Sequence, residues 1–151
     1  MTGIIAGTYL FSSSFTEQQI VHAQTPPPAG GLPAFPGAEG FGAKSVGGRG
    51  GRVIEVTNLN DSGPGSFRDA VEASGPRIVV FRVGGTIELE NRVILRNPYI
   101  TIAGQTAPGG GITLKGADLV VLGAHDVVIR YLRIRKGSGG AVDSIEIEES
   151  Y

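Results

Sequence analysis

The sequence predicts an all-β fold, a parallel β-solenoid in which short strands stack in successive coils. From residue 52 onwards, nine short runs rich in Val, Ile and Leu follow one another, each bounded by Gly, Asn, Pro or Asp. Corresponding positions recur at a nearly constant interval of roughly 20 residues, namely Val79 to Ile100, Ile100 to Val120 and Leu122 to Ile145. No Asn-Gly or Asp-Gly hairpin turn separates the runs, which favours the solenoid over a two-sheet sandwich.

The composition supports one domain built from strands and tight turns. A chain of 151 residues is long enough for a single core, and 25 Gly with 9 Pro suit turns better than packed helices. With 13 Lys and Arg against 14 Asp and Glu, no overall charge favours nucleic acid or an anionic membrane as a partner. The absence of Cys excludes disulfides and thiolate chemistry.

Residues 1–34 precede the predicted domain, which spans residues 35–151. An apolar run, GIIAGTYLF, and a small-residue cleavage pattern ending at Ala23 predict a secretory signal peptide over residues 1–23. No Lys or Arg precedes the run, so an unstructured or mis-started N-terminus is the alternative. The run is too short to cross a bilayer, which takes about 20 apolar residues. Residues 24–34 are rich in Pro and Gly and predict an extended linker.

One short α-helix is predicted over residues 66–74, near the start of the solenoid. Ser66 is the expected N-cap, with Asp69 three residues on, and Gly75 and Pro76 end the helix. Such an amphipathic helix covers the apolar interior that a solenoid exposes at its end. The sequence offers no similar cover after the last run, so we expect a chain that is truncated at its C-terminus or paired with another chain.

One glycine-rich motif and the two histidines are predicted to have no catalytic role. Residues 45–52, SVGGRGGR, lack the Gly-Lys-Ser/Thr of a phosphate-binding loop and are interpreted as a turn. His22 lies in the leader segment and His125 at a turn, so the two histidines cannot form a metal site or a triad. His125 is expected to be solvated.

A basic strip is the first candidate for function. Arg133 and Arg135 share one face of a predicted strand, and together with Lys136 they are expected to project into solvent. The strip is either an ordinary charged face or a contact surface for an acidic polymer, because Arg binds carboxylates through two parallel hydrogen bonds.

Asp143 is the second candidate. It opens the last run, in which Ile145 and Ile147 are expected to point inward and Glu146 and Glu148 outward. Carboxylates on neighbouring coils can converge on a hard cation such as calcium, although these acids equally suit solubilising charge on an edge strand.

Several spaced segments together resemble one known family. The resemblance is carried, in this order, by AFPGAEGFGAKSVGGRGGRVIEVTNLNDSGPGSFRDAVEASGPRIVVFRVGGTIEL, NPYITIAGQTAPGGGITLKG, DVVIRYLRIR and DSIEI. These segments resemble the N-terminal part of the pectate lyases of polysaccharide lyase family 1. The match covers nearly everything from Ala34 to the end of the chain.

The resemblance implies a right-handed parallel β-helix, an extracellular location, bound Ca²⁺ and cleavage of polygalacturonate by β-elimination. In this family calcium bridges the uronate carboxylate to protein carboxylates, which acidifies the C5 proton, and an Arg is thought to remove that proton. Asp143 matches the Asp that opens the calcium-site strand, whereas Ala141 stands where some members have a second acid. The base Arg is expected beyond Tyr151. Three arginines match a strand of the family and not its base: Arg130, Arg133 and Arg135.

We therefore expect an N-terminal fragment of a secreted, calcium-dependent pectate lyase, inactive alone, with polygalacturonate or pectin as its partner and a monomeric full-length form. The alternative is a non-catalytic β-solenoid for carbohydrate binding or adhesion. An inverting glycoside hydrolase would need two acids about 6.5–9.5 Å apart, and the sequence offers no suitable pair.

Overall fold

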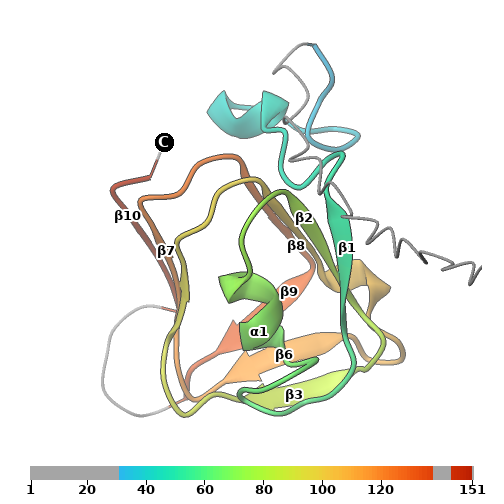
Figure 1. Cartoon of the computed structure of the whole chain (residues 1–151), viewed down its shortest axis with the longest axis vertical. Helices are drawn as coiled ribbons and strands as arrows, with labels where there is room; N and C mark the ends of the chain where they lie inside the picture. Colours follow the sequence, from blue (N-terminus) through green and yellow to red (C-terminus); the bar gives the residue numbers. More distant parts are fainter. Residues whose placement is uncertain (1–30, 138–143, 151) are drawn as a thin grey trace, which may run out of the picture.

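Residues 31–137 and 144–150 are described by the computed structural model, and they form a parallel β-solenoid of about four coils (Figure 1). Sheet A contains β1 (Arg52–Val56), β2 (Arg77–Phe81), β5 (Ile100–Ala103) and β8 (Val127–Arg130). Sheet B contains β3 (Gly85–Glu88), β6 (Ile112–Lys115) and β9 (Leu132–Arg135). Sheet C contains β4 (Val93–Leu95), β7 (Leu119–Leu122) and β10 (Ile145–Glu148). The predicted solenoid is confirmed, and its coils wind clockwise as they recede from the viewer in Figure 1, which makes it right-handed.

The core is a stack of aliphatic side chains that point inward from successive coils. On sheet B, Ile87 pairs with Leu114 and Leu114 pairs with Ile134. Ile87 and Leu114 are fully buried. The residues on either side of each along its strand face outward, as the two-residue period of a strand requires. Burial of one such side chain contributes about 1.5–3 kcal/mol, so the stacked interior stabilises a fold that has no disulfides.

The interval between paired strands is less regular than the sequence spacing indicated, because Ile112 pairs with Leu132 close to the predicted interval whereas the pairs of sheet A are further apart. Val79 pairs with Ile102 and Ile102 pairs with Ile129, so each partner lies further along the chain than predicted. The predicted partners Ile100 and Val120 lie in different sheets, on β5 and β7, so that pairing is wrong. Each coil holds three similar apolar runs, and spacing alone does not tell which runs belong to the same sheet.

The predicted helix is present as α1 (Phe67–Glu72), and it covers the interior of the first coil (Figure 1). The Ser66 hydroxyl accepts a hydrogen bond from the amide of Asp69 at 3.2 Å, as expected for an N-cap. Three of its side chains are buried: Phe67, Ala70 and Val71. Phe67 also stacks on Phe81 of β2, with ring centroids 6.0 Å apart.

Arg77 fastens α1 to the coils. Its side chain is fully buried, and its guanidinium donates five hydrogen bonds to backbone carbonyl oxygens. The acceptors are Ala70, Val71, Gly75, Asn97 and Pro98. Burial lowers the pKa of Arg77 to about 10, with a further contribution from the charge of Arg52, so Arg77 stays a cation at neutral pH.

The described chain begins in the predicted linker. The described chain contains the short 3-10 helices η1 (Phe41–Lys44) and η2 (Gly104–Thr106). The amide of Ala34 donates a hydrogen bond of 2.8 Å to the carbonyl of Ala43, which lies in η1. Residues 45–52 contain the expected turn, and glycine there permits close packing, because a Cβ on Gly48 would lie 1.7 Å from the carbonyl oxygen of Arg77.

The predicted signal peptide, residues 1–23, lies outside the described residues. No helix in the described ranges is long and apolar enough to cross a membrane.

Candidate functional site

The start of sheet C is where we predicted a metal ligand, Asp143, from the sequence. Asp143 itself lies outside the described residues, and the chain is described again from Ser144. The Ser144 carbonyl accepts a hydrogen bond from the amide of Leu119 at 3.2 Å, and the Asp118 carbonyl accepts one from the amide of Val93 at 2.9 Å. The residues that precede the three strands of sheet C therefore stack in one column, namely Arg92, Asp118 and Ser144.

Four charged residues form an ionic group at this end, which we call the sheet C cluster: Arg92, Asp118, Lys136 and Glu146. Asp118 lies at its centre and is 4% exposed. The ammonium of Lys136 is 3.1 Å from Asp118 Oδ1, and a guanidinium nitrogen of Arg92 is 3.4 Å from Oδ2. Arg92 also lies 3.6 Å from Glu146 Oε2. One carboxylate thus holds two cations that come from distant parts of the chain.

Asp118 keeps its negative charge in spite of its burial. Burial by itself would raise the pKa of its carboxyl, but the Lys136 ammonium, the backbone amide of Asp118 and the charge of Arg92 outweigh this effect and hold the pKa below its usual value. Neither Lys136 Nζ nor Asp118 Oδ2 has a hydrogen-bond partner among the described residues. The 3.1 Å contact between Lys136 and Asp118 is therefore chiefly electrostatic, and each partner depends on the other to compensate a buried charge.

The sheet C cluster by itself does not fit calcium. Its two cations balance its two anions, and Asp118 is already compensated, whereas Ca²⁺ takes six to eight oxygen ligands. Within residues 31–137 and 144–150, no group of three His, Cys, Asp or Glu side chains lies close enough together to hold a metal ion. A calcium site at this end would need Asp143 and further carboxylates outside the described residues.

The sequence reasoning missed this cluster. The expectation that Lys136 projects into solvent beside Arg133 and Arg135 is wrong, because its side chain is only 10% exposed. Strand β9 ends at Arg135, so the alternation of faces no longer applies at the next residue, and the charge of Asp118 attracts the ammonium. The sequence did contain a signal for the cluster, because Asp118 comes immediately before the apolar run at residues 119–122. Asp143 has a similar place one coil later, two residues before Ile145.

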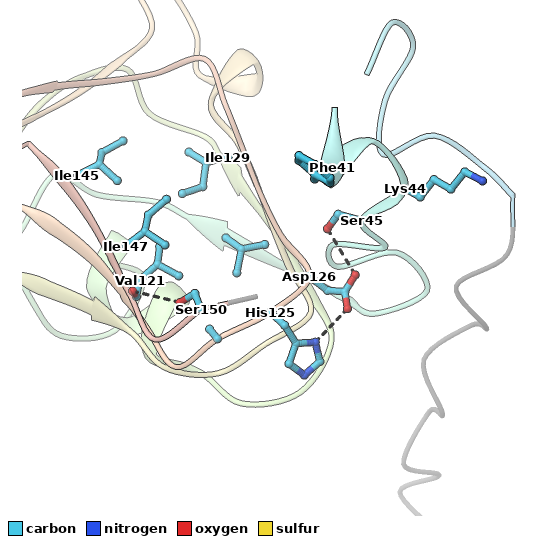
Figure 2. A pocket seen from close by; sticks show the side chains of 13 residues that line it. Phe41, Lys44, Ser45, Val121, His125, Asp126, Ile129, Ile145, Ile147 and Ser150 are labelled. Atoms are coloured by element: carbon cyan, nitrogen blue, oxygen red, sulfur yellow. Dashed lines mark hydrogen bonds and ion pairs between the residues drawn. The ribbon is translucent and has the colours of Figure 1, made fainter. Parts of the chain in front are cut away.

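An apolar hollow of about 740 Å³ lies at the end of the solenoid interior (Figure 2). Its apolar wall comes from η1, from β7 and the turn after it, and from β8 and β10 of the last described coil, with Phe41, Val121, Ala124, Ile129, Ile145 and Ile147. Ile145 and Ile147 line the hollow, as their predicted inward direction requires, yet they are 43% and 70% exposed, because no described coil covers them. The wall offers apolar contact and no reactive group.

The rim of the hollow carries a Ser, an Asp and a His, but these do not form a catalytic triad. Asp126 lies between the other two, with its Oδ1 3.5 Å from the hydroxyl of Ser45 and its Oδ2 3.0 Å from Nδ1 of His125 (Figure 2). A nucleophilic triad needs the His between the Ser and the Asp. Tyr99 packs edge-on against His125, with ring centroids 4.8 Å apart, so the His125 side chain, which is 26% exposed, is partly packed as well as partly solvated.

The three arginines of the family-like strand segment have different surroundings. Arg130 lies over the ring of Phe35, with its guanidinium carbon 4.2 Å from the centroid, and packs the N-terminal segment against β8. Arg133 and Arg135 are exposed on the outer face of sheet B, as predicted. None of the three forms an ion pair or hydrogen bond with Asp118 in the described part of the chain, although Arg135 directly precedes Lys136, which does contact Asp118.

Comparison with known proteins gives strong partial matches. No family model matches the sequence. The chain is 57% identical over 110 residues to a probable pectate lyase C of Aspergillus fumigatus, covering 73% of this chain and 26% of that protein. It is 56% identical over 120 residues to a probable pectate lyase C of Aspergillus terreus, covering 78% of this chain and 28% of that protein. The chain thus spans about a quarter of the length of these curated relatives.

A solved structure shares the arrangement of strands. The crystal structure of jun a 1, the major allergen from cedar pollen, superposes with a TM-score of 0.54 at 26% sequence identity. The alignment covers 63% of this chain and 28% of that chain. Sequence and structural similarity therefore cover similar fractions of the relatives.

Proposed function

Because the chain is homologous to pectate lyases over about a quarter of their length, we propose that it forms the N-terminal coils of such an enzyme, which cleaves polygalacturonate by calcium-dependent β-elimination. The 57% identity over 110 residues carries this proposal, because the match extends over 73% of this chain. The proposal includes an extracellular location, in keeping with the predicted signal peptide over residues 1–23.

A chimera tests whether these coils serve that reaction. Residues 35–151 would replace the matching segment of the Aspergillus fumigatus relative, and polygalacturonate cleavage would be followed by the ultraviolet absorbance of the unsaturated product. We expect the chimera to cleave within about tenfold of the unaltered relative and a chelator to abolish cleavage. A folded chimera without activity would contradict the proposal.

Asp143 is the residue we propose as a calcium ligand of the assembled enzyme. It directly precedes Ser144, which stacks on Asp118 at the start of sheet C, and a carboxylate is a preferred ligand of this hard cation. Calorimetric titration of the chimera with Ca²⁺ alone would test this. The Asp143→Asn variant should bind calcium at least tenfold more weakly, while Glu149→Gln, which removes an exposed acid near the same strand, should not. Equal affinity for all three would remove Asp143 from the site.

We further propose that the chain alone is inactive. The described residues hold no cluster of acids that fits a metal, and the family-like arginines lie on the outer face of sheet B or pack the N-terminal segment. The purified chain should produce no unsaturated product from polygalacturonate with calcium. Clear turnover that a chelator abolishes would contradict this.

A non-catalytic carbohydrate-binding solenoid is the second candidate, favoured by the exposed Arg133 and Arg135. It predicts that the chain is retained on a pectin matrix without calcium and that Asp143→Ala does not change retention. The chimera separates the two functions, because a purely binding module would leave it folded but inactive.

A further inference from the structure

The outer face of sheet B presents a positive surface formed by side chains of β3, β6 and β9. Two rows of residues stack across its three strands: Thr86, Thr113 and Arg133 in one, and Glu88, Lys115 and Arg135 in the other. The Lys115 ammonium lies 2.7 Å from Glu88 Oε1, so these two charges compensate one another. Arg133 and Arg135 then leave the face with two uncompensated positive charges. We call the surface formed by Arg133, Arg135 and the neighbouring threonines the sheet B strip.

Arg133 is held in a fixed orientation. Its Nε donates to the hydroxyl of Thr113 at 3.1 Å, and its Nη2 donates to the carbonyl of Gly110. Gly111 allows this close approach, since a Cβ there would lie 3.1 Å from Nη2. A guanidinium has five N–H groups, so the donors on Nη1 remain available to a ligand. Because the side chain is already ordered, binding costs less conformational entropy than it would for a free Arg.

A shallow hollow of about 460 Å³ adjoins this guanidinium. It is lined by glycines of two turns, by Pro108 and by the side chains of Thr86, Thr113 and Arg133. The wall is therefore mostly backbone and hydroxyl groups, which form hydrogen bonds with the hydroxyls of a sugar ring. An anionic sugar placed here meets a positive charge and hydrogen-bonding groups together.

Arg135 extends the strip along β9. It is exposed, and among the described residues it forms no hydrogen bond or ion pair. Its position two residues from Arg133 on the same strand face places the two side chains about 6.6 Å apart along the strand. A polymer with a carboxylate on successive units can engage both, so weak single contacts add through multivalency.

We propose that the sheet B strip is a calcium-independent binding surface for a polyuronate chain, separate from the start of sheet C. The substrate class rests on the proposed function, whereas the location rests on Arg133, Arg135 and the adjoining hollow. The strip would hold the polymer on the solenoid wall while another part of the molecule acts on it.

Affinity electrophoresis and biolayer interferometry of the full chain on immobilised polygalacturonate, with a calcium chelator present, test this. The Arg133→Ala and Arg135→Ala double variant should bind about tenfold more weakly, and binding should weaken as salt is raised. The matched control is Arg82→Ala, because Arg82 is exposed just after β2 of sheet A and is already paired with Glu55. Retention of the double variant within twofold of the unaltered chain, or binding that requires calcium, would overturn the proposal.

Two further measurements keep the outcome clear. Arg135→Ala alone removes no described contact, so the fold should survive it, and it should weaken binding severalfold even where the double variant fails to fold. Fully methyl-esterified pectin, which has no free carboxylate, should not bind. Arginine-dependent binding to dextran sulfate without binding to polygalacturonate would refute the polyuronate assignment while leaving the chimera result unaffected.

Discussion

Replacing Arg77 by Met should remove the main attachment between α1 and the coils. The guanidinium donates five hydrogen bonds to carbonyl oxygens of α1 and of two turns, and bonds to a charged donor contribute about 1.5–3 kcal/mol each. These values do not add, because Met fills part of the volume and some carbonyls regain water. We expect a loss of about 3–5 kcal/mol, as for the breaking of other buried charged networks.

Urea unfolding followed by far-ultraviolet circular dichroism measures this loss. For a slope of about 2 kcal/mol per molar urea, the midpoint should fall by about 2 M. Arg52→Met is the matched control, because Arg52 pairs with Arg77 in the sheet register yet is exposed and donates one hydrogen bond, to the carbonyl of Ser74 at 3.3 Å. Its midpoint should move by less than about 0.5 M. If the two variants unfold at the same urea concentration, the carbonyl network of Arg77 does not carry the attachment.

Other substitutions test the turn and the buried charges. Gly48→Ala should cost about 1–3 kcal/mol by overpacking against the backbone of β2, whereas Gly42→Ala, which meets no atom within 4 Å, should be neutral in thermal melts. Asp118→Leu should cost about 3–5 kcal/mol because it leaves the Lys136 charge buried and alone; the added change Lys136→Met should restore most of that stability, and a double variant as unstable as the single one would refute the ion-pair argument. The pKa values of Asp118 and Asp126 are lowered in the fold, so each stabilises the protein above the unfolded value of about 3.9 and loses this effect as pH falls through the folded value. Between about pH 4 and pH 2 the free energy of unfolding should therefore fall less steeply in Asp126→Asn than in the unaltered chain, as measured by urea titrations at each pH.

Local patterns predicted individual elements well, and errors arose where distant segments meet. The N-cap at Ser66 and the outward direction of Arg133 follow from neighbours within a few residues, and both are confirmed. Lys136 departs from its expected direction because its partner, Asp118, comes from an earlier strand-bearing segment, distant in sequence and adjacent in space. Strand alternation says nothing about a residue just past the end of a strand, so a long-range charge decides its direction.

The sequence alone determined the class of fold, because apolar runs bounded by turn-forming residues leave a chain of this composition little alternative to stacked strands. The similarity to pectate lyases is also visible in the sequence alone, because sequence identity depends only on the order of residues. Only the tertiary structure decided which runs share a sheet, and therefore which charges meet. Arg77 among five carbonyls, Asp118 between two cations and the Arg133 guanidinium on its glycine turn all depend on the register between successive coils. Register is set by packing of the whole interior, and no short stretch of sequence contains that information.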